Sequence, residues 1–144
     1  KKYKLCIIGN NWIESYLGDS YNILKNSIHG FIEYRNIKGW YKKSKIIIDH
    51  GNIHTTEFGS VNSRIMDSIG CNRLVITNNV IGNKEIFNNH LELYSNYDDI
   101  VKIYDKYKNK TNYENKINEI NKLYYNKNTY SYRADILLKN LCTV

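Results

Sequence analysis

The stretch from Gly59 to Thr77 constrains the fold most, because it joins a glycine-marked loop, a helix of about ten residues and an apolar strand without interruption. Apolar side chains recur on one side of the predicted helix, at Val61, Ile65, Met66 and Ile69. The opposite side carries polar residues, namely Ser60, Ser63, Arg64 and Asp67. This pattern predicts half of a parallel-sheet unit, with the polar face of the helix left to solvent or to a ligand.

The amino end of this helix is suited to a phosphate, because a helix N-terminus carries about half a positive charge and several unpaired N–H groups. Arg64 and Asp67 lie one turn apart and could serve the same ligand. The alternative is a surface ion pair between these two side chains. The helix pattern alone leaves both interpretations open.

The rest of the chain has the order of an α/β protein. Further strands are predicted at residues 4–9, 28–32 and 45–49, with an edge strand at 91–94. Helices are predicted near Tyr21, at 36–43 and 84–87, and as apolar stripes within 100–107, 113–124 and 130–141 that we assign to the core, the first of them capped by Asp98 or Asp99. This order predicts an α/β sandwich with a mostly parallel sheet, and 144 residues fit one domain.

The loops after the predicted strands are where such folds bind ligands. Residues 10–12 follow the first strand, and the glycine signature of dinucleotide-binding folds is absent there, which counts against a nicotinamide or flavin enzyme. Residues 50–57 form a predicted polar loop with His50, His54 and Glu57. Their spacing matches no zinc pattern, so we expect no metal. The interpretations that remain are substrate hydrogen bonding by one histidine and a purely structural loop.

The charge of the chain permits more than one kind of partner. A net charge of +7 with 14 tyrosines is typical of proteins that hold single-stranded nucleic acid. The lysines are spread along the chain, however, which favours solvated helix faces over a specific nucleic-acid site. Peripheral contact with an anionic membrane is a further alternative, useful if an acceptor is lipid-linked.

The location expected for the chain is cytoplasmic. The three cysteines, Cys6, Cys71 and Cys142, show no pairing spacing and sit in or beside apolar runs, as core cysteines do in a reducing compartment. A signal peptide and a long apolar run are both absent from the sequence. The start at Lys1 directly before a strand suggests a fragment of a longer protein.

The run G-S-V-N-S-R-I-M-D-S-I-G-C-N-R-L-V-I-T, residues 59–77, resembles the segment G-x-x-N-x-R-x-(aromatic or aliphatic)-E-A-x-A-C-G-x-x-x-(I/L)-T of group 1 glycosyltransferases. It is most similar to the spore-maturation type of glycosyltransferase-like proteins. Residues 8–12, 39–46 and 129–133 resemble further elements of that family in the same order. The resemblance implies the Rossmann-like carboxyl-terminal half of a GT-B enzyme, a single domain over residues 1–144 that binds a nucleotide-sugar donor and ends in a helix at 129–144.

The resemblance also implies roles for residues of this chain. Asp67 stands where the family has a glutamate that commonly hydrogen-bonds the donor's ribose, and Gly59 stands where the wider superfamily has a further glutamate. Asn72 replaces the usual glycine and tolerates a left-handed turn. The expected donor-binding residues are Asn10, Asn11, Trp12, Tyr34, His54, Gly59, Ser60, Val61, Asn62, Arg64 and Asp67.

In this interpretation the donor's diphosphate meets the helix N-terminus at Ser60, Val61 and Asn62, and Arg64 stabilises the charge of the leaving group as a catalytic residue. Tyr34 is the candidate for the nucleobase. No metal or other cofactor is expected, since GT-B enzymes are usually metal-independent. The acceptor would come from an amino-terminal domain of the same chain, so the fragment alone is expected to be inactive. The alternatives are a non-catalytic glycosyltransferase-like interaction domain and a basic nucleic-acid-binding Rossmann domain.

Overall fold

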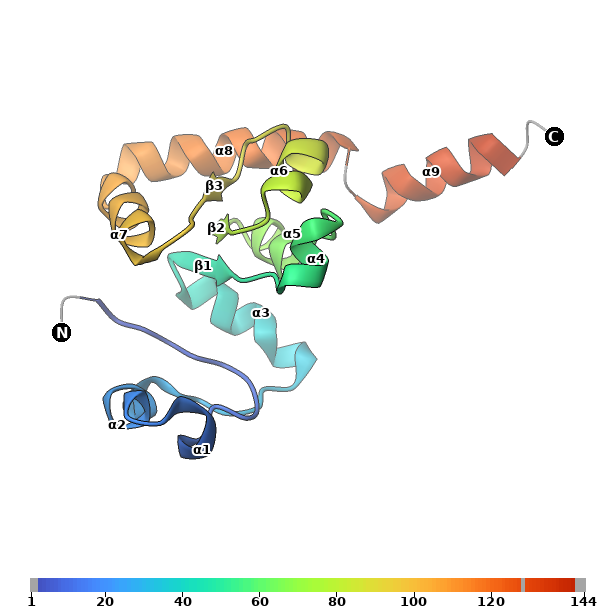
Figure 1. Cartoon of the computed structure of the whole chain (residues 1–144). Helices are drawn as coiled ribbons and strands as arrows, with labels where there is room; N and C mark the ends of the chain where they lie inside the picture. Colours follow the sequence, from blue (N-terminus) through green and yellow to red (C-terminus); the bar gives the residue numbers. More distant parts are fainter. Residues whose placement is uncertain (1–2, 128, 142–144) are drawn as a thin grey trace. The chain divides into compact units, whose positions relative to one another are not determined.

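The computed structural model describes residues 3–127 and 129–141. The chain divides into two compact units, Lys1–Trp40 and Tyr41–Val144, which are considered separately below (Figure 1). The helix α3, Tyr34–Lys43, runs across the division between them. The predicted helix at residues 36–43 is thus confirmed and begins two residues earlier than expected.

The first unit contains the short helices α1, Glu14–Leu17, and α2, Ser20–Leu24, followed by the 3₁₀ turn η1, Lys25–Ser27. The strands predicted at residues 4–9 and 28–32 are wrong as regular strands, because the β-pairing of these segments is limited to an isolated parallel bridge between Ile7 and Ile28. Beside it, the N–H of Gly9 donates to the backbone oxygen of Gly30 at 2.8 Å. Gly9 and Gly30 have φ angles of 134° and 67°, which end the extended conformation. Leu5 and Phe31 are also exposed, whereas parallel strands are normally covered on both faces.

The second unit is built on an open sheet of three parallel strands, β1 (Ile46–Asp49), β2 (Leu74–Thr77) and β3 (Glu92–Leu93), in the order β1-β2-β3. Ile46 pairs with Leu74 and Asp49 with Thr77, so β1 and β2 end together. Each residue of β2 is buried. Ile48 of β1 is 42% exposed, because β1 lies at the edge of this sheet.

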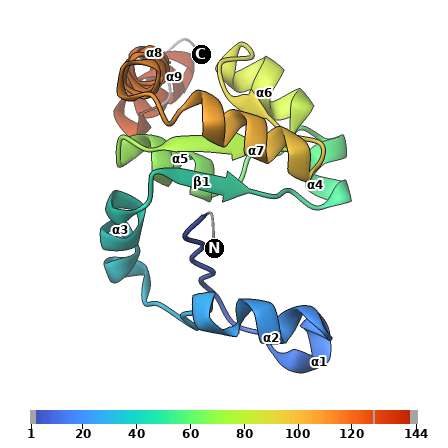
Figure 2. The same ribbon diagram turned by 90° about the vertical axis from the view of Figure 1, so that its left-hand side faces the viewer.

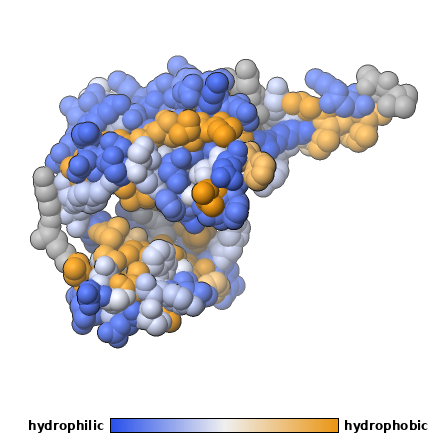
Figure 3. Space-filling view, viewed as in Figure 1, coloured by the Kyte–Doolittle hydropathy of each residue, from blue (hydrophilic) through white to orange (hydrophobic). Residues whose placement is uncertain are grey.

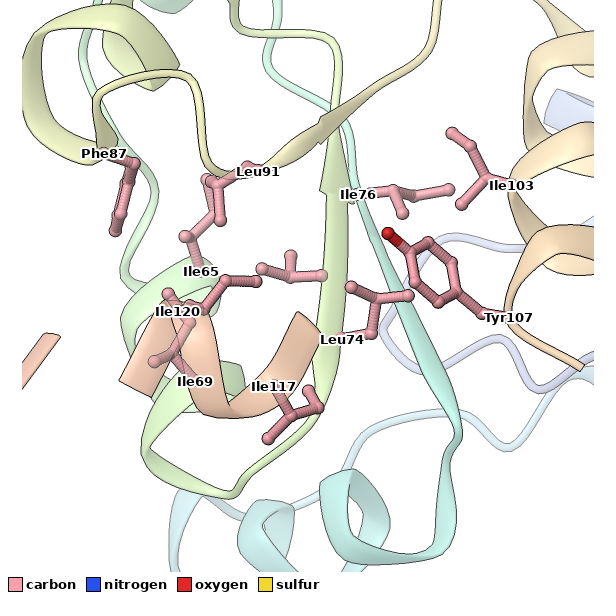
Figure 4. Packing of buried hydrophobic residues seen from close by; sticks show 11 residues of the cluster. Ile65, Ile69, Leu74, Ile76, Phe87, Leu91, Ile103, Tyr107, Ile117 and Ile120 are labelled. Carbon is pink, nitrogen blue, oxygen red and sulfur yellow. The ribbon is translucent and has the colours of Figure 1, made fainter. Parts of the chain in front are cut away.

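Helices cover both faces of this sheet. They are α5 (Ser63–Gly70), α6 (Val80–Phe87), α7 (Tyr97–Lys106) and α8 (Lys110–Lys127). Figure 2 shows α7 in front of the strands and α5 behind them. In Figure 4, Leu74 and Ile76 of β2 point toward Ile103 and Tyr107, and Ile65 of α5 lies on the opposite side of the strand. The fold is therefore a Rossmann-like α/β sandwich with a parallel sheet, as expected.

The polar loop predicted at residues 50–57 is wrong in its second half, where the helix α4, Ile53–Glu57, forms. The side chain of Asn52 accepts a hydrogen bond from the backbone N–H of Thr55 at 2.9 Å and so caps this helix. The hydroxyls of Thr55 and Thr56 donate to the backbone oxygen of Asn52 at 2.9 and 3.0 Å. An N-cap asparagine followed by threonines was the local signal for this turn of helix.

The cap of α7 also differs from the expectation. Its N-cap is Asn96, whose side chain accepts from the backbone N–H of Asp99 at 3.0 Å. Asp99 in turn accepts from the backbone N–H of Ser95 at 3.0 Å. The helix consequently begins one turn before the position that Asp99 would set as the cap, and Asp98 and Asp99 lie in its first turn, where their charge suits the helix dipole.

A polar cluster ties β3 to α7. Glu92 accepts hydrogen bonds from Lys106 at 2.8 Å and from the hydroxyl of Tyr107. Burial alone would raise the pKa of Glu92, but the hydrogen bonds from Lys106 and Tyr107 and the charge of Lys106 lower it below its ordinary value of 4.5. Burial and the bond to Glu92 raise the pKa of Tyr107 to about 12. The lysine of this cluster thus has a carboxylate partner.

The stripe at residues 130–141 was assigned to the core, and this assignment is wrong. The helix α9, Tyr130–Leu141, has no buried residue within it. Leu137, Leu138 and Leu141 are 63%, 59% and 71% exposed, and Figure 3 shows apolar residues on the surface of this helix. The apolar stripe of α9 is therefore exposed in the described part of the chain.

The structure also tests the expectations for the cysteines and for Asn72. Cys6 is exposed, so its assignment as a core cysteine is wrong, whereas Cys71 is partly buried and Cys142 lies outside the described residues. Asn72 has a φ of 57°, as the left-handed turn after α5 requires.

Over the part of the chain that the structure describes, no helix has both the length and the apolar character needed to cross a bilayer.

Candidate functional site

The carboxyl ends of the parallel strands gather several polar side chains at one edge of the sheet. Asp49 ends β1 and Thr77 ends β2, and these two residues pair in the strand register. Tyr94 follows β3 directly. The polypeptide leaves this edge through loops that carry His50, Asn78 and Asn79 and reach the helices α4 and α6. Open parallel sheets bind ligands at this edge.

Asp49 is the centre of the site and is only 1% exposed. Its Oδ1 accepts hydrogen bonds from Nδ2 of Asn62 at 2.9 Å and from Nη1 of Arg64 at 3.2 Å. Its Oδ2 accepts from the hydroxyl of Thr77 at 3.0 Å. A buried carboxylate is stable only when it is paired in this way. Asp49 therefore fixes the positions of Asn62 and Arg64, which both come from the amino end of α5.

The amino end of α5 has no side-chain cap. Asn62 occupies the N-cap position with φ −66° and ψ 142°, but its side chain makes no capping hydrogen bond, because its amide is directed to Asp49. Ser63 is exposed, and Arg64 is 47% exposed at its side chain. The N–H of Ile65 donates to the backbone oxygen of Asn62 at 3.0 Å. The N–H groups of Ser63 and Arg64 and most donors of the guanidinium thus remain to meet a ligand.

The loop before α5 is held by a close approach of two glycines. Gly59 has a φ of +65°, and a Cβ there would lie 2.6 Å from Cγ2 of Ile81. A Cβ on Gly82 would lie 2.7 Å from the backbone oxygen of Gly59 and 2.8 Å from Cγ2 of Val61. Gly59 is buried, so its part in the site is to shape the loop that carries Ser60 and Val61.

Asn79 links this loop to the neighbouring strand and helix. It is 2% exposed, its Nδ2 donates to the backbone oxygen of Ser60 at 2.7 Å, and its Oδ1 accepts from the backbone N–H of Gly82 at 2.8 Å. Asn78 makes a similar pair of bonds with the backbone of Gly51, at 2.8 and 3.0 Å. The two amides thereby hold both loops of this edge against the end of β2.

His50 is oriented by Tyr94. The hydroxyl of Tyr94 lies 3.0 Å from the backbone oxygen of Asp49 and 3.0 Å from Nδ1 of His50. A carbonyl oxygen only accepts, so the phenol proton goes to Asp49 and Nδ1 of His50 must donate to the phenol oxygen. The neutral imidazole then presents Nε2 as an acceptor. Burial, with the charge of Asp49 second, raises the pKa of Tyr94, so this phenol keeps its proton.

The structure brings part of the predicted site together. Asn62 and Arg64 meet at Asp49. The expected helix N-terminus at Ser60 and Val61 is wrong, because α5 begins at Ser63 and these residues form the loop before it, where the N–H of Ser60 donates to the backbone oxygen of Thr55 at 2.9 Å. The alternative surface pair between Arg64 and Asp67 is wrong, since Arg64 pairs with Asp49. Asp67 is partly buried one turn further along α5. His54 lies on α4 and is exposed.

The remaining predicted residues belong to the first unit. Asn10 and Asn11 are exposed, and Asn11 has a φ of 68°. Trp12 is 42% exposed, and its Nε1 would lie 3.2 Å from a Cβ built on Gly9. Tyr34 begins α3 and is 75% exposed. Their part in a donor site stays a prediction.

The residues that organise the site were not among those predicted. They are Asp49, Thr77, Asn78, Asn79 and Tyr94. Each follows or ends an apolar run, so position at a predicted carboxyl edge was the available signal. No local pattern indicates that a buried aspartate would pair with an arginine 15 residues away.

The site offers oxygen and nitrogen groups but no metal cluster. Within residues 3–127 and 129–141, no group of three or more His, Cys, Asp or Glu side chains could hold a metal ion. His50 and His54 have different surroundings, one beside Tyr94 and the other on α4. The groups that this edge presents are N–H donors, a guanidinium, a carboxylate and an imidazole.

Comparison with known proteins identifies the family. The sequence matches the family model described as glycosyl transferase-like over residues 1–139, which is nearly the whole chain. Searches of curated proteins and of solved structures gave no significant match. A match of this extent agrees with a Rossmann-like sheet whose carboxyl edge carries the polar site. The chain thus belongs to the glycosyltransferase-like family.

Proposed function

We propose that the chain binds a nucleotide-diphosphate sugar at the carboxyl edge of its sheet and presents the sugar for transfer. The observation that carries this proposal is the uncapped amino end of α5 with Arg64 fixed beside it by the buried Asp49. Family membership supports a transferase of this type. The amino end of α5 would receive the diphosphate, because it combines N–H donors with the positive end of the helix dipole.

Arg64 is the residue to which we assign the largest part of the phosphate contact. One of its nitrogens is engaged by Asp49 at 3.2 Å, which orients the guanidinium without covering it. A guanidinium matches phosphate oxygens with parallel hydrogen bonds. The negative charge of Asp49 offsets the positive charge of Arg64. The helix N-terminus therefore supplies the remaining positive potential for the diphosphate.

Other residues of the edge would bind the rest of the donor. Asp67, one turn beyond Arg64, is assigned to the ribose hydroxyls, as the family resemblance implies. Nε2 of His50, an acceptor by the argument above, suits a hydroxyl of the sugar. Tyr34 as a contact of the base, and Asn10, Asn11 and Trp12 as further donor contacts, stay predictions from the family resemblance, because these residues belong to the first unit.

In the transfer step, an acceptor oxygen bonds to the anomeric carbon of the sugar. The bond from that carbon to the diphosphate breaks, and its electron pair goes to the diphosphate oxygen. Arg64 and the first N–H groups of α5 would stabilise this growing charge, because they are already in position before the reaction. The acceptor and the base that takes its proton are assigned to another domain of the full-length protein.

Calorimetric titration with a panel of UDP-, GDP- and other nucleotide sugars tests donor binding. We expect one member of the panel to bind, and Arg64→Ala to weaken that binding by about 1–3 kcal/mol. Arg64→Lys is the matched control, since it keeps the charge but loses the planar fork and should recover only part of the affinity. Equal affinity of the wild-type and Arg64→Ala proteins would contradict the proposed site.

A non-catalytic interaction domain is the second candidate, and the surroundings of Gly59 favour it. The superfamily glutamate expected at that position has no equivalent, and the space beside Gly59 is closed by Ile81 and Gly82. Incubation of the full-length protein with the donor that binds distinguishes the two candidates. Release of the nucleoside diphosphate supports the transferase, and tight binding without any release supports the interaction domain.

A further inference from the structure

A second polar site lies at the opposite, amino-terminal edge of the sheet. A pocket of about 700 Å³ is lined there by residues next to the start of β1 and β2 and by the first turns of α8. Lys45 directly precedes β1 and Arg73 directly precedes β2. Asp49 ends β1, so the strand itself separates this pocket from the candidate donor site.

The lining of this pocket is strongly cationic. Five of its eleven residues are cations, namely Lys42, Lys43, Lys45, Arg73 and Lys110. Among the described residues that line it, Glu114 supplies the one carboxylate, and its Oε1 is already 3.7 Å from Nζ of Lys110. The pocket therefore holds an excess of positive charge in a concave surface, which focuses the field on an anion.

Arg73 is held in the pocket by a neutral group. Its Nη2 donates to the backbone oxygen of Lys42 at 2.7 Å, and its Nε is buried with no hydrogen-bond partner among the described residues. A guanidinium that is partly desolvated without an anion is unfavourable by itself. An anion beside Arg73 would compensate for this.

Lys45 is positioned in the same way. Its Nζ donates to the backbone oxygen of Lys108 at 3.4 Å and lies 5.4 Å from the centre of the Tyr113 ring. The hydroxyl of Tyr113 donates to the backbone oxygen of Lys45 at 2.9 Å. One backbone carbonyl and an aromatic face orient this cation, and neither neutralises its charge.

We propose that this pocket is a second binding site, for a ligand that carries phosphate groups. Several positive charges converge on one concave surface, and the volume is that of sites which hold small organic ligands. The phosphate can come from a free small molecule or from the head group of an anionic lipid. The inference does not depend on the proposed donor site, because the two share no residue.

Titration of the full-length protein with inorganic pyrophosphate tests this site, in an Arg64→Ala background that weakens the candidate donor site. We expect binding to persist in Arg64→Ala and to fall about tenfold or more when Lys42→Ala is added. Arg73→Gln should have the same effect. Lys42 is exposed, so Lys42→Ala keeps the test valid if Arg73→Gln impairs folding. Binding that depends on Arg64 alone would overturn the second site and leave the donor site intact.

Lys122→Ala is the matched control, because Lys122 is exposed on the same helix as Lys110 and lies outside the pocket. It removes the same charge and should leave pyrophosphate binding unchanged. Co-sedimentation with vesicles of phosphatidylcholine, with and without phosphatidylglycerol, separates the two sources. Binding only to the anionic vesicles, lost in Lys42→Ala, identifies a lipid head group. No binding of either probe, or equal losses in Lys42→Ala and Lys122→Ala, overturns the proposal.

Discussion

The two edges of the sheet hold their arginines in different ways. At the carboxyl edge, Arg64 is paired with a buried carboxylate that also binds Asn62 and Thr77. At the amino edge, Arg73 is held by the backbone oxygen of Lys42 and has lysines around it. Arg64 is thus positioned by a carboxylate that offsets its charge. Arg73 is positioned by an uncharged carbonyl that does not.

This difference separates two uses of positive charge. A guanidinium paired with a buried carboxylate is fixed in direction but contributes little net charge, which suits a site where geometry decides the reaction. A guanidinium held by a carbonyl contributes direction and charge together. The carboxyl edge is therefore arranged for orientation, and the amino edge for attraction of anions.

The largest expected effect comes from Asp49→Ala, which breaks the centre of the carboxyl edge. It leaves the donors of Asn62, Arg64 and Thr77 without their acceptor. We expect a loss of about 2–4 kcal/mol in the free energy of unfolding, below the full value for a buried pair because Arg64 is half exposed. Urea denaturation measures this loss.

Asp67→Ala is the control for this change, since Asp67 is an aspartate of α5 that is only partly buried. It should alter the unfolding free energy by no more than about 0.5 kcal/mol. Similar losses in both variants would show that Asp49 does not organise the edge.

A smaller effect is expected from Gly59→Ala, which tests the loop that shapes the carboxyl edge. The left-handed φ of +65° and the 2.6 Å approach to Cγ2 of Ile81 together should cost about 2 kcal/mol. Gly39→Ala is the matched control in α3, where a Cβ meets nothing within 4 Å, and it should stabilise by about 0.4–1 kcal/mol. Thermal unfolding should show a lower Tm for Gly59→Ala and a higher Tm for Gly39→Ala. Shifts of the two Tm values in the same direction would contradict this expectation.

The smallest effect compares two lysines. Lys106→Met removes the ion pair with Glu92 at 2.8 Å and should cost about 1 kcal/mol at neutral pH. Lys42→Met should change stability by no more than about 0.5 kcal/mol, because its ammonium has no carboxylate partner among the described residues. A large loss for Lys42→Met would mean that the cations of the amino edge are structural.

The pH dependence of these variants sharpens the comparison. The pKa of Glu92 lies below its ordinary value of 4.5 in the folded chain, so its contribution is present above that value and is lost as the pH falls through the folded pKa. Lys106→Met should flatten this acid limb, and Lys42→Met should leave it as in the wild type. The free energy of unfolding of the two variants, measured by denaturation between neutral pH and about pH 3, distinguishes these two outcomes.

The centre of the fold followed from the sequence, whereas the contacts that organise the site did not. Apolar spacing located β2 and α5 because both are buried by their neighbours, and Asn72 marked the turn between them. The same reasoning failed for α9, whose apolar stripe is exposed, since periodicity cannot say whether a covering element is present. It also failed for α4, where a single asparagine cap and local hydroxyl bonds decide the conformation.

Asp49 and Tyr94 show why the site could be predicted only in part. Family resemblance pointed to Arg64 and Asn62, but their partner lies on another strand, and Tyr94 reaches it from a third. Such contacts depend on strand order and register, which no local pattern contains. The amide bonds of Asn78 and Asn79 depend on the same register.

The bond between Tyr94 and the backbone of Asp49 gives the shortest strand an influence on the imidazole of His50. β3 is only two residues long, and the N–H of Tyr94 is held by the backbone oxygen of Thr77 at 3.1 Å. Fraying at the end of β3 would withdraw Tyr94 and leave the ring of His50 free to exchange its proton between its two nitrogens. Deuterium uptake at the amide of Tyr94 would therefore time how often this histidine loses its preset orientation.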